Sequence, residues 1–355
     1  MHILYPFVKR FIAGEDIQTA LKSIDHLYNS GFLSTVDVLG ENVCRADQAL
    51  RAKLAYLDLL DHVRESSHPM DFSVKLTQMG LDIDLALCES NIEEIIEGAG
   101  TNTVRFDIEG SRHTQPILDM CLKMHFRHKN LGQALQAYLY RTGKDVDTMI
   151  DAGVSVRLCK GAYKEPPDIA YQDMDDIREN FLKHTYKLIK NGFQPAIATH
   201  DEYLLTEILS FVDRENIGRR SFYFEMLYGV RRDLQKILLD KGYQVRIYVP
   251  YGKSWLPYTL RRLTEKKENI LFVMKNLFRE TFGIRKLHLS NPILRMADPQ
   301  PSTQNLKIAL LTTSFPRFEG DYAGNFVLKF AQGLKKAGCD INAVVPHDQE
   351  TDFSG

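Results

Sequence analysis

Charged and hydrogen-bonding side chains recur inside short apolar runs of this sequence or at the ends of those runs. They are Lys75, Asp107, Glu109, Gln136, Arg157, Lys160, Thr199, His200, Asp201, Glu225 and Tyr248. A lysine inside an apolar run, such as Lys75, is costly unless it is paired. Polar residues at matching places of most runs indicate one shared site, because scattered surface charge would not favour the ends of runs. Such a site could bind an anion through its cations, hold a cofactor or hold a metal ion.

A second polar cluster follows the last of these runs. Tyr258, Arg261, Arg262 and Glu265 are spaced so that they share one face of a helix, and Pro257 suits the first turn of that helix. An adjacent pair of arginines suits fork-like binding of a carboxylate. The alternative is a solvated, charged helix face, which is the common fate of such a stretch.

The first set of residues also has purely structural interpretations. Lys75 and Asp107 could form a structural ion pair, and His200 could be a hydrogen-bonded core residue. Gly161 and Ala162 could form only a tight turn between a strand and a helix. The joint placement of these residues at successive runs favours a functional site.

Eight nearly continuous apolar runs are typical of strands that are buried on both faces. They are Ser34–Glu41, Phe72–Gln78, Thr103–Gly110, Gln133–Tyr140, Val154–Tyr163, Pro195–Asp201, Phe222–Gly229 and Gln244–Gly252. Between them, Asp47–Glu65, Ile177–Asn191 and Glu202–Arg214 have apolar residues at helical spacing. This alternation predicts an α/β fold with a parallel sheet, and eight strands favour a closed (β/α)8 TIM-type barrel.

Two observations bear on the alternatives to this barrel. No G-x-G-x-x-G follows the early strands, which weakens an open dinucleotide-binding sheet. The run after Gly132 could also be a helix. In a barrel of this type the active site lies at the carboxyl ends of the strands, which is where the polar residues fall.

The composition excludes several other classes of protein. The chain has 355 residues, of which 44% are hydrophobic and 26% charged, and its net charge of −1 gives no sign of nucleic-acid binding. Its five cysteines form no C-x-x-C pair, so neither a structural zinc site nor any other metal is expected. Without a signal peptide or an apolar membrane span, we expect a cytoplasmic protein. Peripheral contact with the inner face of the membrane needs only an amphipathic surface, so it stays open.

The chain changes character after the predicted barrel. Ser290–Gln304 holds three prolines among polar residues, which is typical of a linker. After it, a strand at Leu306–Thr312, a helix at Asn325–Gly338 and a strand at Asp340–Val345 form one βαβ unit. We therefore predict a barrel over 1–289, a linker over 290–305 and a βαβ fragment over 306–355.

Seven strings in order resemble the proline dehydrogenase family over residues 5–285. They are SVKLTQMGLDID, LGQALQAYLYRT, VSVRLCKGAY, AIATHD, FYFEMLYGVR, QVRIYVPYG and YTLRRLTE. The resemblance implies a distorted (β/α)8 barrel that holds FAD and oxidises L-proline to Δ1-pyrroline-5-carboxylate. It implies the first step of proline catabolism to glutamate, with electrons passed to a quinone and pyrroline-5-carboxylate dehydrogenase as a candidate partner.

The resemblance also implies roles for particular residues. FAD would be held by Ile108, Gln136, Lys160, Gly161, Ala162, Thr199 and His200. The substrate carboxylate would meet Lys75, Arg261 and Arg262. The pocket around the proline ring would be formed by Tyr163, Leu227, Tyr248 and Tyr258. Asp107 and Arg157 would be the catalytic pair.

Physical chemistry is consistent with these roles. Hydride leaves a carbon next to nitrogen, so the amine lone pair must be free, and nearby cations lower the pKa of that amine. Arg157 near a flavin would stabilise the negative charge that develops on reduction. Asp107 would hold Lys75 or Arg157 in place. The apolar ring of proline needs a small, dry pocket, which tyrosine and leucine supply.

The C-terminal segment resembles part of a different enzyme. Residues 306–349 resemble the start of a GT-B glycosyltransferase, but its second half is lacking, so we expect no sugar transfer.

A metal-dependent barrel hydrolase could use Asp107, Glu109, His200 and Asp201, although no H-x-H occurs. A non-catalytic or impaired fusion product is the third alternative.

Overall fold

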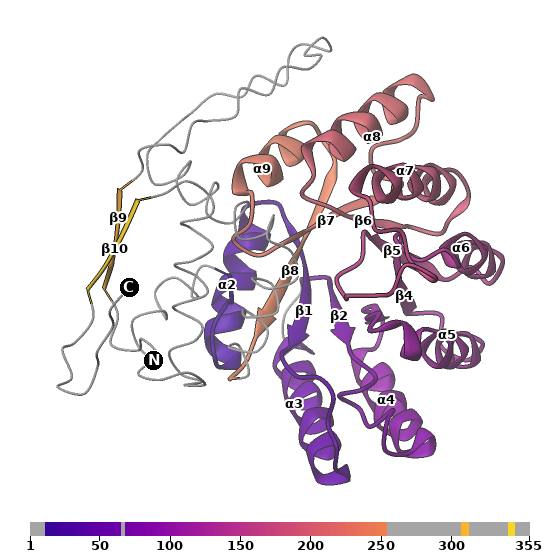
Figure 1. Cartoon of the computed structure of the whole chain (residues 1–355). Helices are drawn as coiled ribbons and strands as arrows, with labels where there is room; N and C mark the ends of the chain where they lie inside the picture. The colour runs from indigo at the N-terminus through magenta and orange to yellow at the C-terminus, as the bar shows by residue number, and fades with distance from the viewer. Residues whose placement is uncertain (1–10, 65–67, 254–306, 312–339, 345–355) are drawn as a thin grey trace. The chain divides into compact units, whose positions relative to one another are not determined.

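The computed structural model describes residues 11–64, 68–253, 307–311 and 340–344. The chain divides into two units, Met1–Phe278 and Arg279–Gly355. In the first unit, eight strands form a closed barrel in chain order, and β8 pairs with β1 to close it (Figure 1). Every pairing in the barrel is parallel. The predicted (β/α)8 barrel is therefore confirmed.

Each predicted run overlaps one strand of the barrel, although β1, β2 and β4 begin one or two residues before their runs. The strands are β1 Leu33–Val38, β2 Met70–Val74, β3 Val104–Phe106, β4 Leu131–Gln136, β5 Ser155–Cys159, β6 Ala196–Ala198, β7 Tyr223–Leu227 and β8 Gln244–Tyr251. The run after Gly132 is a strand and not a helix. All eight strands end before their predicted runs do, and the last residues of each run belong to the loop that follows.

Helices alternate with the strands and lie around the outside of the barrel (Figure 1). They are α2 Ile17–Asn29, α3 Ala46–Arg64, α4 Leu85–Ala99, α5 Ser111–His125, α6 Thr142–Asp151, α7 Met174–Asn191, α8 Glu202–Arg214 and α9 Arg232–Asp240. Asp84 and Asp201 begin α4 and α8 by accepting a backbone N–H of the first turn. The additional helix α2 precedes the barrel and contacts β1 and β8.

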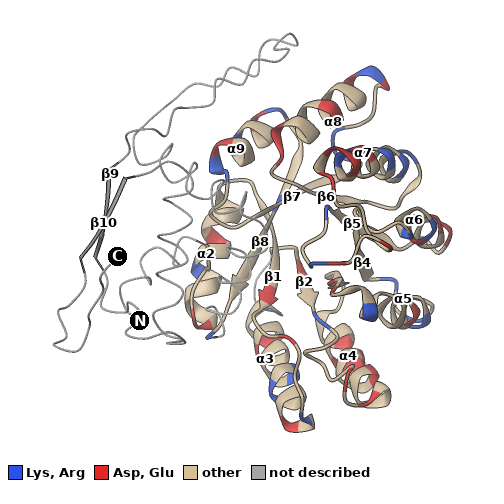
Figure 2. Cartoon of the chain, in the orientation of Figure 1, with Lys and Arg blue, Asp and Glu red and all other residues tan. Residues whose placement is uncertain are grey.

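Side chains alternate along the strands between an apolar outer layer and a polar interior. Phe72, Phe106 and Phe224 are fully buried and belong to the core between strands and helices. Their neighbours Ser73 and Glu225 are buried too, but their partners lie on non-adjacent strands, so they point into the barrel. Charged residues are frequent on the helices around the barrel and also occur on its strands (Figure 2). The buried Arg157 and Glu225 of the strands bond to each other across the interior. The barrel thus encloses a polar centre.

The second unit contains two described strands, β9 Lys307–Leu311 and β10 Asp340–Val344, which pair in parallel. Both fall within the strands predicted for this segment. The predicted helix Asn325–Gly338 lies outside the described residues. The predicted boundaries at 289 and 305, and the glycosyltransferase resemblance, stay predictions.

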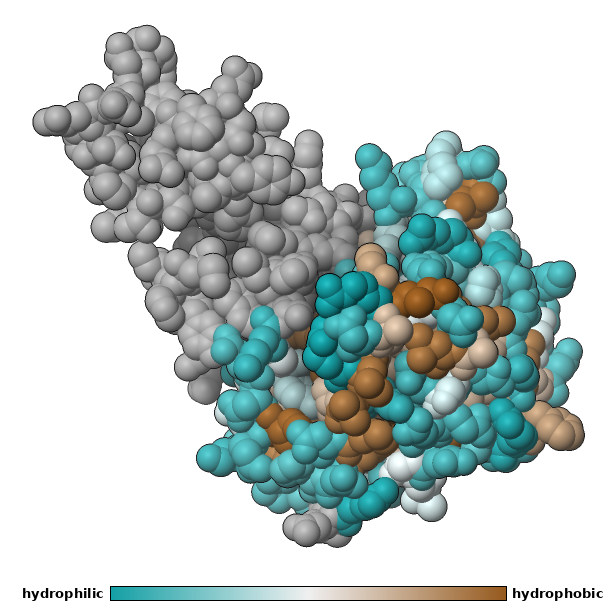
Figure 3. Space-filling view, turned by 90° about the horizontal axis from the view of Figure 1, so that it is seen from below, coloured by the Kyte–Doolittle hydropathy of each residue, from teal (hydrophilic) through white to brown (hydrophobic). Residues whose placement is uncertain are grey.

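The face that Figure 3 shows is mainly hydrophilic over the described residues and carries a patch of hydrophobic side chains. Exposed large apolar residues include Leu50 and Leu54 of α3 and Leu85 of α4. Exposed apolar residues of this kind are usual in folded proteins. No helix among the described residues is long and apolar enough to cross a membrane.

Candidate active site

Asp107 is the centre of a buried hydrogen-bond network inside the barrel. It directly follows β3, and its two carboxylate oxygens accept hydrogen bonds from four side chains. Lys75 Nζ donates to Oδ2 over 2.8 Å and Tyr248 OH donates to the same oxygen over 2.9 Å. Ser73 Oγ donates to Oδ1 over 2.6 Å, and Arg157 Nη2 donates to that oxygen too. Both carboxylate oxygens are therefore fully used.

Arg157 of β5 spans the barrel between two carboxylates. Besides Asp107, its Nη1 donates to Glu225 Oε1 of β7 over 2.7 Å, and its Nη2 donates to Ser73 Oγ over 2.7 Å. Its guanidinium lies 5.2 Å from the centre of the Tyr248 ring. These contacts fix the plane of the guanidinium. Asp107 consequently holds both Arg157 and Lys75, where the sequence had left the choice open.

Lys75 has a third partner that the sequence interpretation missed. Its Nζ donates to Asp37 Oδ1 of β1 over 3.1 Å and lies 3.4 Å from Tyr248 OH. Ser73 was missed as well. The alternation of the run STVDV, in which Asp37 stands between two valines, was the available signal for an inward-facing carboxylate.

The charges of this centre shift the pKa values of its acids in opposite directions. Burial alone would raise the pKa of Asp107, but Lys75 and Arg157 outweigh burial and hold it well below its ordinary value. Burial raises the pKa of Asp37, and the nearby Asp107 carboxylate adds to that effect, against the attraction of Lys75. The centre contains three carboxyl groups, those of Asp37, Asp107 and Glu225, but two cations. Asp37 is the acid that resists ionisation.

Next to this centre, the ends of β4 and β5 form a close backbone contact. Ala162 N donates to Gln136 Oε1 over 3.3 Å, and Gln136 Nε2 donates to the Glu109 carbonyl oxygen over 3.0 Å. Gly161 has a φ of 128°, and a Cβ there would lie 2.3 Å from a ring atom of Tyr138. Only glycine fits this position.

The loops after β5 and β6 are joined by an ion pair. Lys160 Nζ lies 2.6 Å from Asp201 Oδ2, and Arg178 Nε donates to the same oxygen over 2.9 Å. Arg178 Nη1 also pairs with Asp175 Oδ1 over 3.2 Å, so two partly exposed cations and two carboxylates meet at the edge of the site. Thr199 Oγ1 accepts from the Asp201 backbone over 3.1 Å. This edge therefore presents two partly exposed cations, each already paired with a carboxylate.

His200 joins the end of β6 to β7. Its Nε2 accepts a hydrogen bond of 2.8 Å from the Leu227 backbone N–H. An acceptor Nε2 places the proton of a neutral imidazole on Nδ1. His200 and Leu227, like Lys160, Gly161 and Ala162, are half-buried, so the carboxyl ends of β5, β6 and β7 present a partly accessible surface.

The other predicted site residues lie either near the ends of the strands or outside the described residues. Ile108 is buried beside Asp107, and Tyr163 is half-buried in the loop after β5. Glu109 lies apart from the Asp107 network and accepts from Thr77 N and Thr77 Oγ1, over 3.1 and 2.5 Å. Tyr258, Arg261 and Arg262 lie outside the described residues.

The residues considered for a metal-dependent hydrolase do not share one site. Asp107 contacts Lys75, Glu109 contacts Thr77, Asp201 contacts Lys160 and His200 contacts a backbone N–H. Over 11–64, 68–253 and the two short C-terminal strands, no group of three or more His, Cys, Asp or Glu side chains is placed to hold a metal ion.

Comparison with known proteins gives a consistent result. Residues 20–275 match the family model described as proline dehydrogenase. Proline dehydrogenase 2 of Bacillus subtilis (strain 168) is 34% identical over 270 residues, covering 76% of this chain and 89% of that protein. Proline dehydrogenase of Deinococcus radiodurans is 31% identical over 285 residues, covering 78% of this chain and 91% of that protein.

Solved structures show the same fold. Proline utilization A (PutA) from Bdellovibrio bacteriovorus, inactivated by N-propargylglycine, aligns with a TM-score of 0.69 and 22% identity over 80% of this chain and 34% of that one. PutA from Corynebacterium freiburgense aligns with a TM-score of 0.64 and 18% identity over 82% of this chain and 34% of that one. The present chain thus spans about a third of each PutA chain, and the likeness concerns the barrel fold.

Proposed function

Because this chain belongs to the proline dehydrogenase family and is an enzyme of that activity, we propose its reaction in finer detail. It oxidises L-proline to Δ1-pyrroline-5-carboxylate with FAD as the hydride acceptor, and electrons pass on to a quinone. This is the first step of proline catabolism to glutamate. The observation that carries the proposal is the buried network of Lys75, Asp107, Arg157 and Tyr248, which joins predicted site residues from four parts of the chain.

The network by itself does not supply the positive charge that binding of a substrate carboxylate requires. With three carboxyl groups against two cations, the described centre alone has no net positive charge to attract a carboxylate. Arg261 and Arg262, predicted to bind the substrate carboxylate, would add two positive charges and make the site attractive to it. Lys75, which already contacts Asp37 and Asp107, acts with them as the third cation. We therefore assign the main share of carboxylate binding to the arginine pair.

The same cations prepare the amine of the substrate. Proline in water is a secondary ammonium ion, whose lone pair is occupied and cannot assist loss of hydride. Positive charge from Lys75, Arg157 and the arginine pair disfavours the ammonium form and lowers the pKa of the bound amine. Asp107 keeps Lys75 and Arg157 in fixed positions, so this field is present before the substrate arrives.

The half-buried ends of β4, β5 and β6 fit a flavin cofactor. FAD, when bound, supplies the acceptor for the hydride. Gly161 and Ala162 present backbone with little side chain, and Gln136 fixes that backbone through Ala162 N. Lys160 and Arg178 are partly exposed cations that can donate hydrogen bonds to a pyrophosphate, and Asp201 and Asp175 hold them in place. Ile108, Thr199 and His200 complete the residues we propose to hold the cofactor.

The proposed pocket for the ring lies among Tyr163, Leu227, Tyr248 and Tyr258. Tyr248 is the described member whose position is fixed most firmly, since its hydroxyl donates to Asp107 and its ring faces Arg157.

A quinone acceptor is lipid-soluble, which would require contact with the inner face of a membrane. Pyrroline-5-carboxylate dehydrogenase is the enzyme proposed to consume the product.

An anaerobic absorbance spectrum of the purified full chain, recorded before and after addition of L-proline, tests the proposal. Yellow protein that bleaches with L-proline but not with D-proline supports flavin, substrate and hydride transfer together. Yellow protein that does not bleach contradicts the substrate assignment. Colourless protein that stays inactive when FAD is added supports the impaired fusion product instead.

A further inference from the structure

A small cavity lies at the amino-terminal end of the barrel, opposite the site described above. Its volume is about 40 Å³, and it is lined by side chains at or near the starts of several strands, among them Asp71 of β2, Ser155 of β5, Tyr223 of β7 and Arg246 of β8. In a parallel barrel the starts of all strands lie at one end. The cavity therefore belongs to neither the substrate nor the cofactor region.

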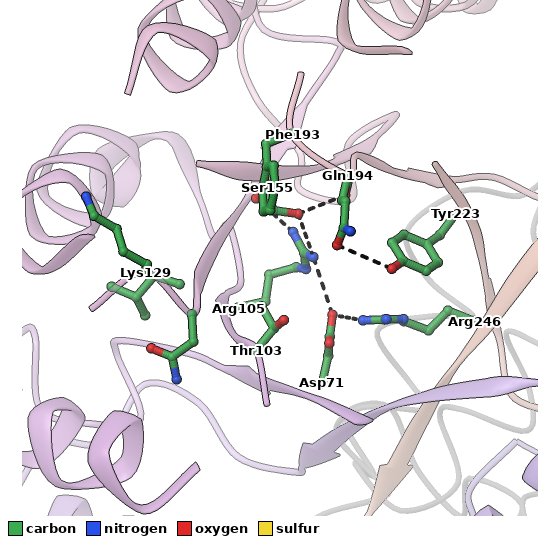
Figure 4. A pocket seen from close by; sticks show the side chains of 11 residues that line it. Asp71, Thr103, Arg105, Lys129, Ser155, Phe193, Gln194, Tyr223 and Arg246 are labelled. Atoms are coloured by element: carbon green, nitrogen blue, oxygen red, sulfur yellow. Dashed lines mark hydrogen bonds and ion pairs between the residues drawn. The ribbon is translucent and has the colours of Figure 1, made fainter. Parts of the chain in front are cut away.

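Two buried guanidinium groups face a single carboxylate in this cavity. Arg105 and Arg246 approach Asp71 from two directions (Figure 4), and both contact its Oδ2, Arg105 Nη2 over 3.4 Å. The Arg105 and Arg246 side chains are 2% and 9% exposed. Among the described residues that line the cavity, Asp71 carries the one carboxylate. Glu225 attracts Arg105 from farther inside the barrel, but its Oε1 is bound to Arg157.

Both arginines retain hydrogen-bond donors that nothing described satisfies. Arg105 Nη1 and Nη2 donate to the carbonyl and hydroxyl oxygens of Ser155 over 2.9 and 3.2 Å. The Nε atoms of Arg105 and Arg246 have no acceptor among the described residues. Burial lowers the pKa of each guanidinium to about 10, so both stay charged at neutral pH. A buried cation without a full set of acceptors is costly unless an anion or water completes the set.

The backbone and neighbouring side chains leave room for this pair. A Cβ at Gly132 would lie 2.7 Å from Arg105 Nη1, so glycine at this position creates the space that the guanidinium occupies. Tyr223 lies 4.5 Å from the Arg246 guanidinium and bonds to Gln194 at 3.4 Å. Lys129, an exposed residue, adds a third positive charge to the lining.

We propose that this cavity binds one small monovalent anion, a halide or a small carboxylate such as formate, between Arg105 and Arg246. A single water needs about 10–15 Å³ of such space, so the observed volume admits an ion of this size and excludes proline. The anion supplies the second negative charge that the two guanidinium groups lack. It holds β3 and β8 together at the base of the barrel, and its binding does not depend on the proposed reaction.

Thermal unfolding of the full chain at matched ionic strength provides the solution test. Sodium gluconate, whose anion is too large for the cavity, is replaced stepwise by sodium chloride, bromide or formate. We expect Tm to rise with the concentration of the added anion and to level off. The rise should be about 5 °C when that concentration is roughly a hundred times Kd. The Arg246→Gln variant should lose this rise, because Asp71 then balances Arg105. The surface variant Lys190→Gln should keep it, which controls for general salt effects.

Bromide-soaked crystals of the unaltered protein provide a test that does not depend on any variant folding. An anomalous peak between Arg105 and Arg246 supports the proposal, and a rise in Tm with halide alone or with formate alone defines which anion fits. No peak together with equal Tm in gluconate, halide and formate overturns it and leaves water as the occupant. An equal rise in Arg246→Gln would also overturn it.

Discussion

Replacing either of two buried aspartates by asparagine should affect stability very differently, although both substitutions keep the side-chain shape. Asp107 accepts four hydrogen bonds, two of them from cations. In Asp107→Asn the new NH2 group must face a donor, and Lys75 and Arg157 lose their shared counter-charge. Removing one partner of a buried ion pair costs about 3–5 kcal/mol, and here that corresponds to a fall in Tm of roughly 10 °C.

Asp37→Asn should cost far less, about 1 kcal/mol or less, which is the size of one net hydrogen bond. Asp37 Oδ1 accepts from Lys75, and an amide oxygen can do the same. Its Oδ2 accepts no hydrogen bond from the described residues. The centre also has one carboxyl group more than it has cations, so neutralising Asp37 removes the excess.

The two variants should also differ in their pH dependence. The pKa of Asp37 is raised in the folded protein, so ionisation of this group costs stability as the pH rises above the unfolded value of 3.8. Asp37→Asn should therefore gain stability relative to the unaltered protein over that range. The pKa of Asp107 is lowered, so its contribution is present above 3.8 and is lost as the pH falls.

Urea unfolding followed by circular dichroism measures these free energies, with the exposed Asp58→Asn as the control. The comparison requires that the dependence on urea be equal for all proteins. Equal losses in Asp37→Asn and Asp107→Asn, or a larger loss in Asp37→Asn, would refute the account of the centre. If the free energy of unfolding depended on pH in the same way in Asp37→Asn and in the unaltered protein, the raised pKa assigned to Asp37 would be refuted.

Three further substitutions test the proposed cofactor and substrate regions. Gly161→Ala should prevent stoichiometric flavin binding, seen as lost flavin absorbance, and destabilise by about 1–3 kcal/mol, because its Cβ meets the Tyr138 ring at a φ that disfavours alanine. Arg262→Met should raise KM for proline by roughly 10- to 100-fold, the size of a charge-assisted hydrogen bond, while flavin stays bound; an unchanged KM removes Arg262 from the carboxylate role. Lys160→Ala should weaken FAD affinity by roughly tenfold in titrations of the apoprotein, whereas Lys190→Ala on the outer surface of α7 should not; equal affinities would contradict the pyrophosphate role.

The barrel could be predicted because its signal is local. Each strand is a short apolar run, and the helix Glu202–Arg214 was predicted with the bounds that the structure gives. Strand ends were predicted less well. Lys75 and Asp107 were placed within strands but directly follow β2 and β3.

The sequence by itself determined the parallel barrel, the placement of polar residues at the strand ends and the family to which the chain belongs. It did not determine which polar side chain meets which. Lys75 reaches Asp37, Asp107 and Tyr248, which come from β1, the end of β3 and β8.

Only closure of the barrel brings these groups together, and only their distances show that carboxyl groups outnumber cations at one end while guanidinium groups outnumber carboxylates at the other. Coulomb energy depends on separation in space and on burial, and neither can be read from position along the chain.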